Sequence, residues 1–165
     1  MTISPDQAYG LTQFLIADFE RETPTTVRVL SHVPAGQEGY TPDPKSMHAL
    51  RLAWHIASAD VWFLNCISSG AFASGGSAIP ESIKTAADVV AWYETNQPAA
   101  VAKVRAMTPE QCAKVIDFKG VMQASAVVFL QLAIKHSVHH RGQLSTYLRP
   151  MGAKVPGIYG PSGDA

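Results

Sequence analysis

Three of the six histidines of the chain lie within five positions, in the segment HSVHH at residues 136–140. On an α-helix, residues four apart lie on one face, with Cβ atoms about 6 Å apart. His136 and His140 can therefore aim ring nitrogens at one ion, at metal–nitrogen distances of roughly 2.0–2.1 Å. His139 points about 100° away from His140 around the helix, so it is a poor third ligand for the same ion. The best pair is His136 with His140.

A third ligand has to come from elsewhere in the chain, and His55 is the best candidate. It lies in the segment LAWHIASAD, in the middle of a predicted apolar helix. Facing helices of a bundle can direct side chains into a shared interior. His48 is two turns from His55, about 10 Å along the axis, so one ion cannot bind both. From spacing alone, two other interpretations stay open: histidines paired within the core, or histidines solvated at the surface.

The motif has no built-in general base. Zinc proteases of the HExxH type carry a Glu between their two helical histidines, whereas Ser137, Val138 and His139 stand there in this chain. Three neutral imidazoles would leave the ion its full charge and at least one open position, which is the layout of a catalytic site. Such an ion lowers the pKa of a thiol or a water molecule in the open position.

Helix signals dominate the rest of the chain. Ser4, Pro5 and Gln7 predict a capped helix start, and the helix should run to about Val33, with a kink or a restart capped by Thr23 at Pro24. Ser46 is the predicted cap of a second helix, whose buried positions should include Leu50, Trp54, Ala57 and Ile67.

The second half of the chain predicts three further helices and no strands. Thr85 with Asp88 indicates a third helix with a kink at Pro98, and TPEQ at 108–111 opens a short one. The last helix should run from near Val121 to about Arg149, because Pro150 and Gly152 follow. No stretch alternates apolar and polar residues between hairpin turns. We therefore expect an all-α fold, a four-helix bundle with short extra helices.

Composition predicts a single globular domain over residues 1–165. Apolar residues make up 47% and charged residues 16% of the chain, and the formal net charge is zero. Scattered basic residues give no electrostatic footprint for nucleic acid. Cys66 and Cys112 lack CxxC spacing. Neither a signal peptide nor a membrane-spanning segment is visible, so the expected location is cytoplasmic.

The chain resembles the DinB/YfiT-like superfamily of damage-inducible bacterial proteins. The resemblance rests on the segments LAWHIASADVWF, HSVHHRGQLSTYLRPMG and VPGIYG, in this order over nearly the whole chain. It implies an up-down-down-up four-helix bundle, often a homodimer. It also implies a divalent metal, zinc or nickel among the candidates, held by His55, His136 and His140. Arg141 and Gln143 match the motif, either as partners of the ligands or as structural residues.

The resemblance implies three functions, which the residues do not separate. The first is a metal-dependent enzyme that activates a low-molecular-weight thiol to attack a small electrophilic substrate, as a thiol transferase does. The second is a metal-dependent hydrolase that uses water in the same position. The third is a metal-binding, stress-related protein without catalysis. Asp60 lies on a different face from His55 and is not expected to be the base, and Trp62 could wall a pocket.

Overall fold

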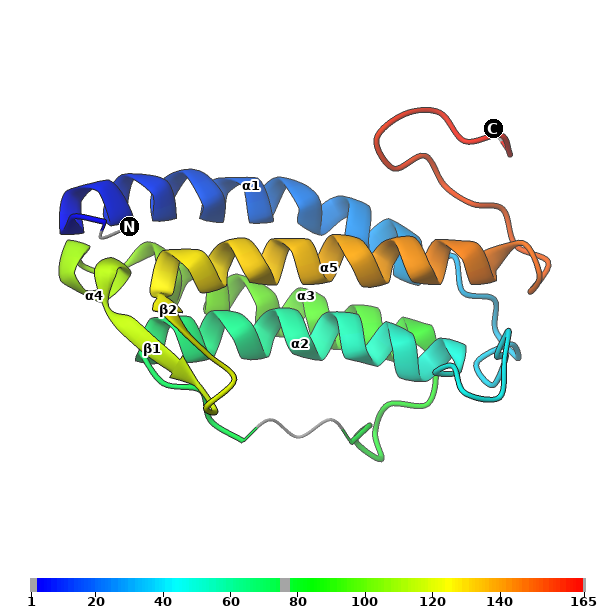
Figure 1. Cartoon of the computed structure of the whole chain (residues 1–165). Coiled ribbons are helices and arrows are strands. Elements are labelled where there is room, and N and C mark those ends of the chain that lie inside the picture. Colours follow the sequence, from blue (N-terminus) through cyan, green and yellow to red (C-terminus); the bar gives the residue numbers. More distant parts are fainter. Residues whose placement is uncertain (1–2, 75–77, 165) are drawn as a thin grey trace.

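The computed structural model describes residues 3–74 and 78–164, and its main elements are long helices (Figure 1). In chain order they are α1 (Pro5–Ser31), α2 (Ala49–Ser69), α3 (Ala86–Arg105), α4 (Pro109–Ala113), β1 (Val115–Phe118), β2 (Met122–Ser125) and α5 (Ala126–Leu148). The fold is the expected all-α bundle, to which one short hairpin is added.

The four long helices have the up-down-down-up arrangement. α1 runs from left to right in Figure 1, α2 and α3 both run back, and α5 runs in the direction of α1. The connection between α2 and α3 therefore returns along the length of the bundle. α2 packs beside α3 and α5, and α1 packs beside the same two helices, so α1 and α2 lie on opposite corners. This arrangement brings the middle of α2 against the middle of α5.

Three helices start at capping boxes, at the positions that the local sequence predicts. Ser4, Thr85 and Thr108 each accept a hydrogen bond from the backbone three residues on, and each receives the reciprocal contact. The expected restart at Pro24 is wrong, because α1 continues through this proline to Ser31. α3 likewise continues through Pro98 to Arg105. Tertiary packing along the whole helix outweighs the loss of one backbone hydrogen bond at each site.

Two helix starts differ from the sequence predictions. α2 begins at Ala49 and not after Ser46, since His48 is the N-cap and its Nδ1 accepts a hydrogen bond from the backbone of Arg51. α5 begins at Ala126, five residues after the predicted Val121. The residues before it form β2, which pairs with β1 in antiparallel register from Val115–Ser125 to Phe118–Met122.

A tight turn explains the hairpin that sequence patterning missed. Lys119 and Gly120 have φ values of 53° and 75°, and Val121 donates a backbone hydrogen bond to Phe118. Two consecutive positive φ values define the turn that matches the twist of paired strands. The strands are only four residues long, too short for a visible alternation.

The core lies between the four long helices, and α2 is buried around most of its circumference. All four predicted positions on α2, Leu50, Trp54, Ala57 and Ile67, are at most 9% exposed. Among the described residues, no helix combines the length and the apolar character that a membrane crossing requires. Within this core, α2 and α5 are the pair that carries the candidate ligands.

Candidate metal centre

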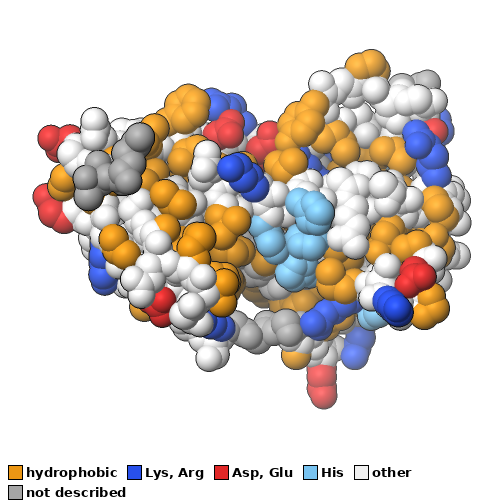
Figure 2. Space-filling view, viewed as in Figure 1, with side chains coloured by type: hydrophobic (Ala, Val, Ile, Leu, Met, Phe, Trp, Pro, Cys, Tyr) orange, Lys and Arg blue, Asp and Glu red, His pale blue; other side chains and the backbone are white. Residues whose placement is uncertain are grey.

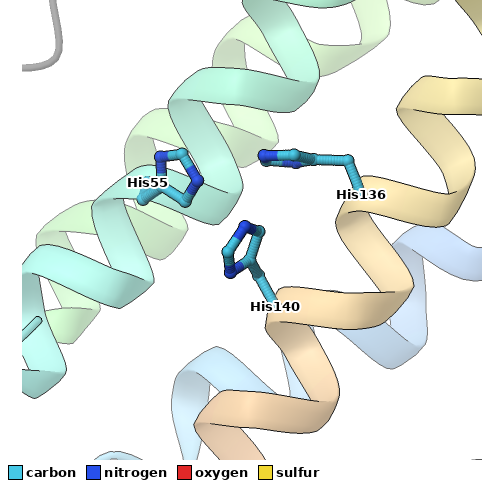
Figure 3. A group of neighbouring side chains, drawn as sticks. All are labelled: His55, His136 and His140. Carbon is cyan, nitrogen blue, oxygen red and sulfur yellow. The ribbon is translucent and has the colours of Figure 1, made fainter. Parts of the chain in front are cut away.

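His55 from α2 meets His136 and His140 from α5 at the surface between the two helices (Figure 3). One ring nitrogen of each residue can be chosen so that the three atoms lie within 4.8 Å of one another. The ring centroids are 4.5–4.8 Å apart. The helix pair therefore brings together the three histidines that the sequence singled out, which is compatible with a divalent metal site.

The remaining nearby histidines are kept out of this group by helix geometry. His139 is exposed, and its ring lies beside that of His140 with centroids 4.8 Å apart. His48 lies at the start of α2, where it caps the helix. Among the described residues, neither a carboxylate nor a thiol joins the three imidazoles. A cation held here would keep its full charge and an open coordination position.

Burial prepares two of the imidazoles for metal binding. Desolvation, together with the neighbouring His140, His55 and His139, lowers the pKa of His136 to about 4. Desolvation also lowers the pKa of His55, with contributions from His140 and Arg51. Both groups are therefore neutral at pH 7, and the neutral imidazole is the form that binds a metal ion.

His136 is not a core histidine with both nitrogens paired. Its Nδ1 is buried and has no hydrogen-bond partner in the described part of the chain. A buried ring nitrogen without a hydrogen-bond partner costs free energy, so hydrogen bonding within the core does not account for the place of this histidine. The donor set, three borderline nitrogen ligands in a half-buried cluster, fits zinc and nickel alike.

The histidines are open to solvent on one side. All three are partly exposed, and Figure 2 shows a group of histidine side chains in the middle of the drawn face, with apolar side chains next to it. The Phe63 ring packs against His136 with centroids 5.5 Å apart, and Phe63 is 5% exposed. Trp62 contacts Phe63, Phe72 and Phe118 and also lines a shallow groove with Asn65 and Lys103. It therefore packs against the hairpin rather than beside the ligands.

Arg141, which follows the ligand His140 directly, has a structural role. Its guanidinium is 1% exposed and donates hydrogen bonds to Glu22 and Thr26 of α1 and to Tyr159 of the C-terminal tail. The side chain points away from the metal cluster into the bundle. Of the two motif residues left open by the sequence, this one joins α5, α1 and the tail.

Asp60 is a buried polar residue whose place the sequence did not reveal. It is 1% exposed, and its Oδ2 accepts hydrogen bonds from Tyr93 of α3 at 2.7 Å and from Ser137 of α5 at 3.0 Å. Burial raises the pKa of the carboxyl to about 7, although Tyr93, Ser137 and Arg141 act in the opposite direction. The signal in the sequence was an acidic residue five positions after a candidate ligand, within an otherwise mostly apolar segment.

Comparison with known proteins decides the family. The sequence model of the DinB family matches residues 10–164. This chain belongs to the DinB family. Its DinB relatives include the uncharacterized Bacillus subtilis protein YjoA, 29% identical over 84% of this chain and 89% of YjoA. The uncharacterized YrdA of the same organism is 30% identical over 68% of this chain and 66% of YrdA.

Two crystal structures of DinB-like proteins share the bundle. The structure of YjoA superposes with a TM-score of 0.72 at 28% identity and covers 89% of this chain and 98% of the YjoA chain. A DinB-like protein from Bacillus cereus gives a TM-score of 0.73 at 25% identity, over 88% of this chain and 95% of the other. The DinB helical bundle therefore extends over nearly the whole described chain.

Proposed function

We propose that this DinB-family chain is a metal-dependent enzyme in which His55, His136 and His140 bind zinc or nickel, and that it transfers a small thiol to an electrophile. The observation that carries the proposal is the meeting of three ring nitrogens within 4.8 Å, without a fourth ligand from the described residues. A closed structural site would use four protein ligands. Here one side faces solvent, where a substrate can arrive.

The proposed chemistry needs an anionic nucleophile at neutral pH. A bound divalent cation supplies positive charge, which three neutral imidazoles do not cancel, and so lowers the pKa of a thiol next to it. The thiol sulfur then forms a bond to an electrophilic carbon, the leaving group departs with its bonding electrons, and the thiol proton passes to solvent. The Phe63 ring covers His136 on one side and keeps water from it there, which strengthens this electrostatic effect.

A hydrolase that uses water in the same position is the second candidate, and a non-catalytic metal-binding stress protein is the third. The described residues near the cluster favour the thiol enzyme over the hydrolase. Neither Asp nor Glu joins the histidine group, and Asp60 is turned into the core by Tyr93 and Ser137. Hydrolysis benefits from a positioned base more than thiol transfer does, because a thiol is far more acidic than water.

Metal analysis tests the proposal first. Protein purified without a histidine tag is compared with His140→Ala and with the control His139→Ala, whose exposed ring lies outside the group. We expect near-stoichiometric zinc or nickel in the wild type and in His139→Ala, and little in His140→Ala. If all three proteins lack metal and none binds added zinc or nickel at micromolar concentration, the proposal of a metal-dependent enzyme is wrong.

Turnover then separates the three functions. An activated aryl halide and an ester are offered to the metal-loaded protein with and without a low-molecular-weight thiol. Consumption of the halide only with thiol identifies the transferase, and ester cleavage without thiol identifies the hydrolase. A metal-loaded protein that is inactive in every combination supports the non-catalytic alternative.

We also propose that the protein is a cytoplasmic homodimer that acts on small molecules and not on nucleic acid or membranes. Light scattering measures the oligomeric state.

A further inference from the structure

A line of polar side chains continues from the histidines along the same face of α5. His136, His140, Gln143 and Tyr147 follow one another at spacings of four, three and four residues. Nδ1 of His140 lies 2.9 Å from Oε1 of Gln143, and Nε2 of Gln143 donates to the hydroxyl of Tyr147 at 3.3 Å. His140 is thus the one ligand of the three with a hydrogen-bonded side-chain partner among the described contacts.

The direction of these bonds decides which nitrogen of His140 is free. The amide of Gln143 can present either its oxygen or its NH2 group to the ring. In the structure the oxygen is the amide atom that lies next to the ring, where it accepts from Nδ1–H, and the NH2 group donates to Tyr147. The proton of neutral His140 is then held on Nδ1, and the lone pair lies on Nε2. In Figure 3 the distal nitrogen of the His140 ring points toward His55 and His136.

We propose that Gln143 is a positioning residue for metal binding: its amide oxygen accepts from Nδ1–H of His140 and so fixes the tautomer and the ring orientation of this ligand, while the hydroxyl of Tyr147 accepts from the amide NH2 group. The role of Gln143 in metal binding rests on the proposed function, whereas the hydrogen bonds between the side chains do not depend on it. Hydrogen-bonded partners of ligand histidines commonly change metal affinity by roughly 10–100-fold when they are removed. The reversed amide would donate to Nδ1 and place the proton on Nε2, where it blocks the metal.

Tyr147, which accepts from the Gln143 amide, is itself held in place by packing. Tyr147 is 3% exposed, and its ring meets that of Tyr40 edge to face with centroids 5.8 Å apart. The carbonyl of Tyr40 accepts a hydrogen bond at 2.8 Å from the backbone of Ala49, the first residue of α2. The same contacts therefore tie the orientation of His140 on α5 to the start of the helix that carries His55.

The experiment compares three variants with the wild type. Gln143→Met keeps the length of the side chain and removes the acceptor. Gln143→Glu keeps an oxygen acceptor and serves as the conservative rescue. Gln131→Met makes the same chemical change at an exposed position of α5 and is the matched control. Two readouts are taken: the histidine tautomer in the metal-free protein by long-range proton–nitrogen NMR, at a pH where the rings are neutral, and zinc and cobalt affinity by chelator competition.

We expect His140 to carry its proton on Nδ1 in the wild type, Gln143→Glu and Gln131→Met, and to become a mixture of tautomers in Gln143→Met. Metal affinity should fall roughly 10–100-fold in Gln143→Met and stay within a few-fold in the other two. An unchanged tautomer in Gln143→Met, or unchanged affinity despite a changed tautomer, would overturn the inference. If no variant binds metal but the tautomer shifts, the proposed function fails and the positioning of His140 by Gln143 stands.

Discussion

At the scale of single residues, Asp60 links stability to pH. A free Asp has a pKa of about 3.9, whereas burial raises the pKa of Asp60 to about 7. Between these values the folded chain binds the proton more tightly than the unfolded chain. The contribution of Asp60 to the free energy of unfolding therefore falls as the pH rises from about 4 to 7, and it is constant above about 7.

The variant Asp60→Asn tests this link, because an amide does not titrate. We expect the free energy of unfolding of the wild type, minus that of Asp60→Asn, to decrease by on the order of a few kcal/mol from pH 4.5 to pH 7.5. Urea unfolding of both proteins across this range measures the difference, and the titration of the histidines cancels in it to first order. A difference that does not vary with pH contradicts a raised pKa.

Sequence reasoning reached the three histidines and missed the groups that surround them. His136 and His140 share a helix, so their spacing is a local property, and His55 was found through its apolar neighbours. Asp60 depends on Tyr93 and Ser137 from two other helices. Gln143 was seen as part of the motif, and both of its side-chain contacts, His140 and Tyr147, lie on the same helix. The local sequence pattern does not reveal neighbours from other helices, such as those of Asp60.

At the scale of elements, Arg141 holds α1, α5 and the tail together, and its partner Glu22 can be tested. Glu22→Ala leaves the buried guanidinium without its carboxylate, which should lower the free energy of unfolding by about 2–4 kcal/mol. The matched control is Glu20→Ala on the same helix, whose ion pair with Arg105 is exposed on both sides and should matter by less than about 1 kcal/mol. Denaturant melts of both variants give the comparison, and equal losses would contradict a buried role.

The hairpin turn gives a second test at this scale. Gly120 has φ at 75°, so Gly120→Ala should destabilise the chain by about 1 kcal/mol through backbone strain. Gly10, inside α1, has open space around its missing Cβ. Gly10→Ala should instead stabilise by about 0.5–1 kcal/mol, because alanine favours the helix. Thermal unfolding distinguishes the opposite signs, and a stabilising Gly120→Ala would mean that the turn has another conformation.

Element prediction succeeded where the signal was local. Three capping boxes placed α1, α3 and α4, since the side chain and the backbone that it caps are three residues apart. The start of α5 was wrong because β2 is defined by its pairing with β1 and not by its own four residues. The restart predicted at Pro24 was wrong for a related reason: packing against neighbouring helices keeps α1 continuous.

At the scale of the whole molecule, a bound cation should stabilise the fold. Binding to the folded state alone adds RT ln(1 + [L]/Kd), about 2.7 kcal/mol at a free metal concentration 100 times Kd. We expect zinc or nickel to raise the midpoint of thermal unfolding of the metal-free wild type and to leave His55→Ala almost unchanged. Differential scanning fluorimetry at several metal concentrations measures the effect. A wild-type midpoint that does not move with metal would show that the cluster does not bind it.

The bundle itself was predictable from helix signals and length, whereas its helix order came from the resemblance to DinB proteins. Capping residues and apolar stripes predict how many helices form and which face of each is buried, but they do not predict which helices are neighbours. The long return between α2 and α3 makes these two parallel, and only the assembled structure shows that α2 then lies beside α5. The packing of α2 against α5 is what brings His55 together with His136 and His140.

The spacing of the three ligands along the chain also bears on the order of assembly. His55 is made first, and the other two histidines follow 81 and 85 residues later, close to the C-terminus. Before the bundle has formed, a cation meets at best the local pair on one helix, since closing the long loop costs chain entropy. Capture by all three is therefore a late event in biosynthesis. An ion that binds all three histidines only in the folded bundle would therefore slow unfolding and leave the rate of folding nearly unchanged.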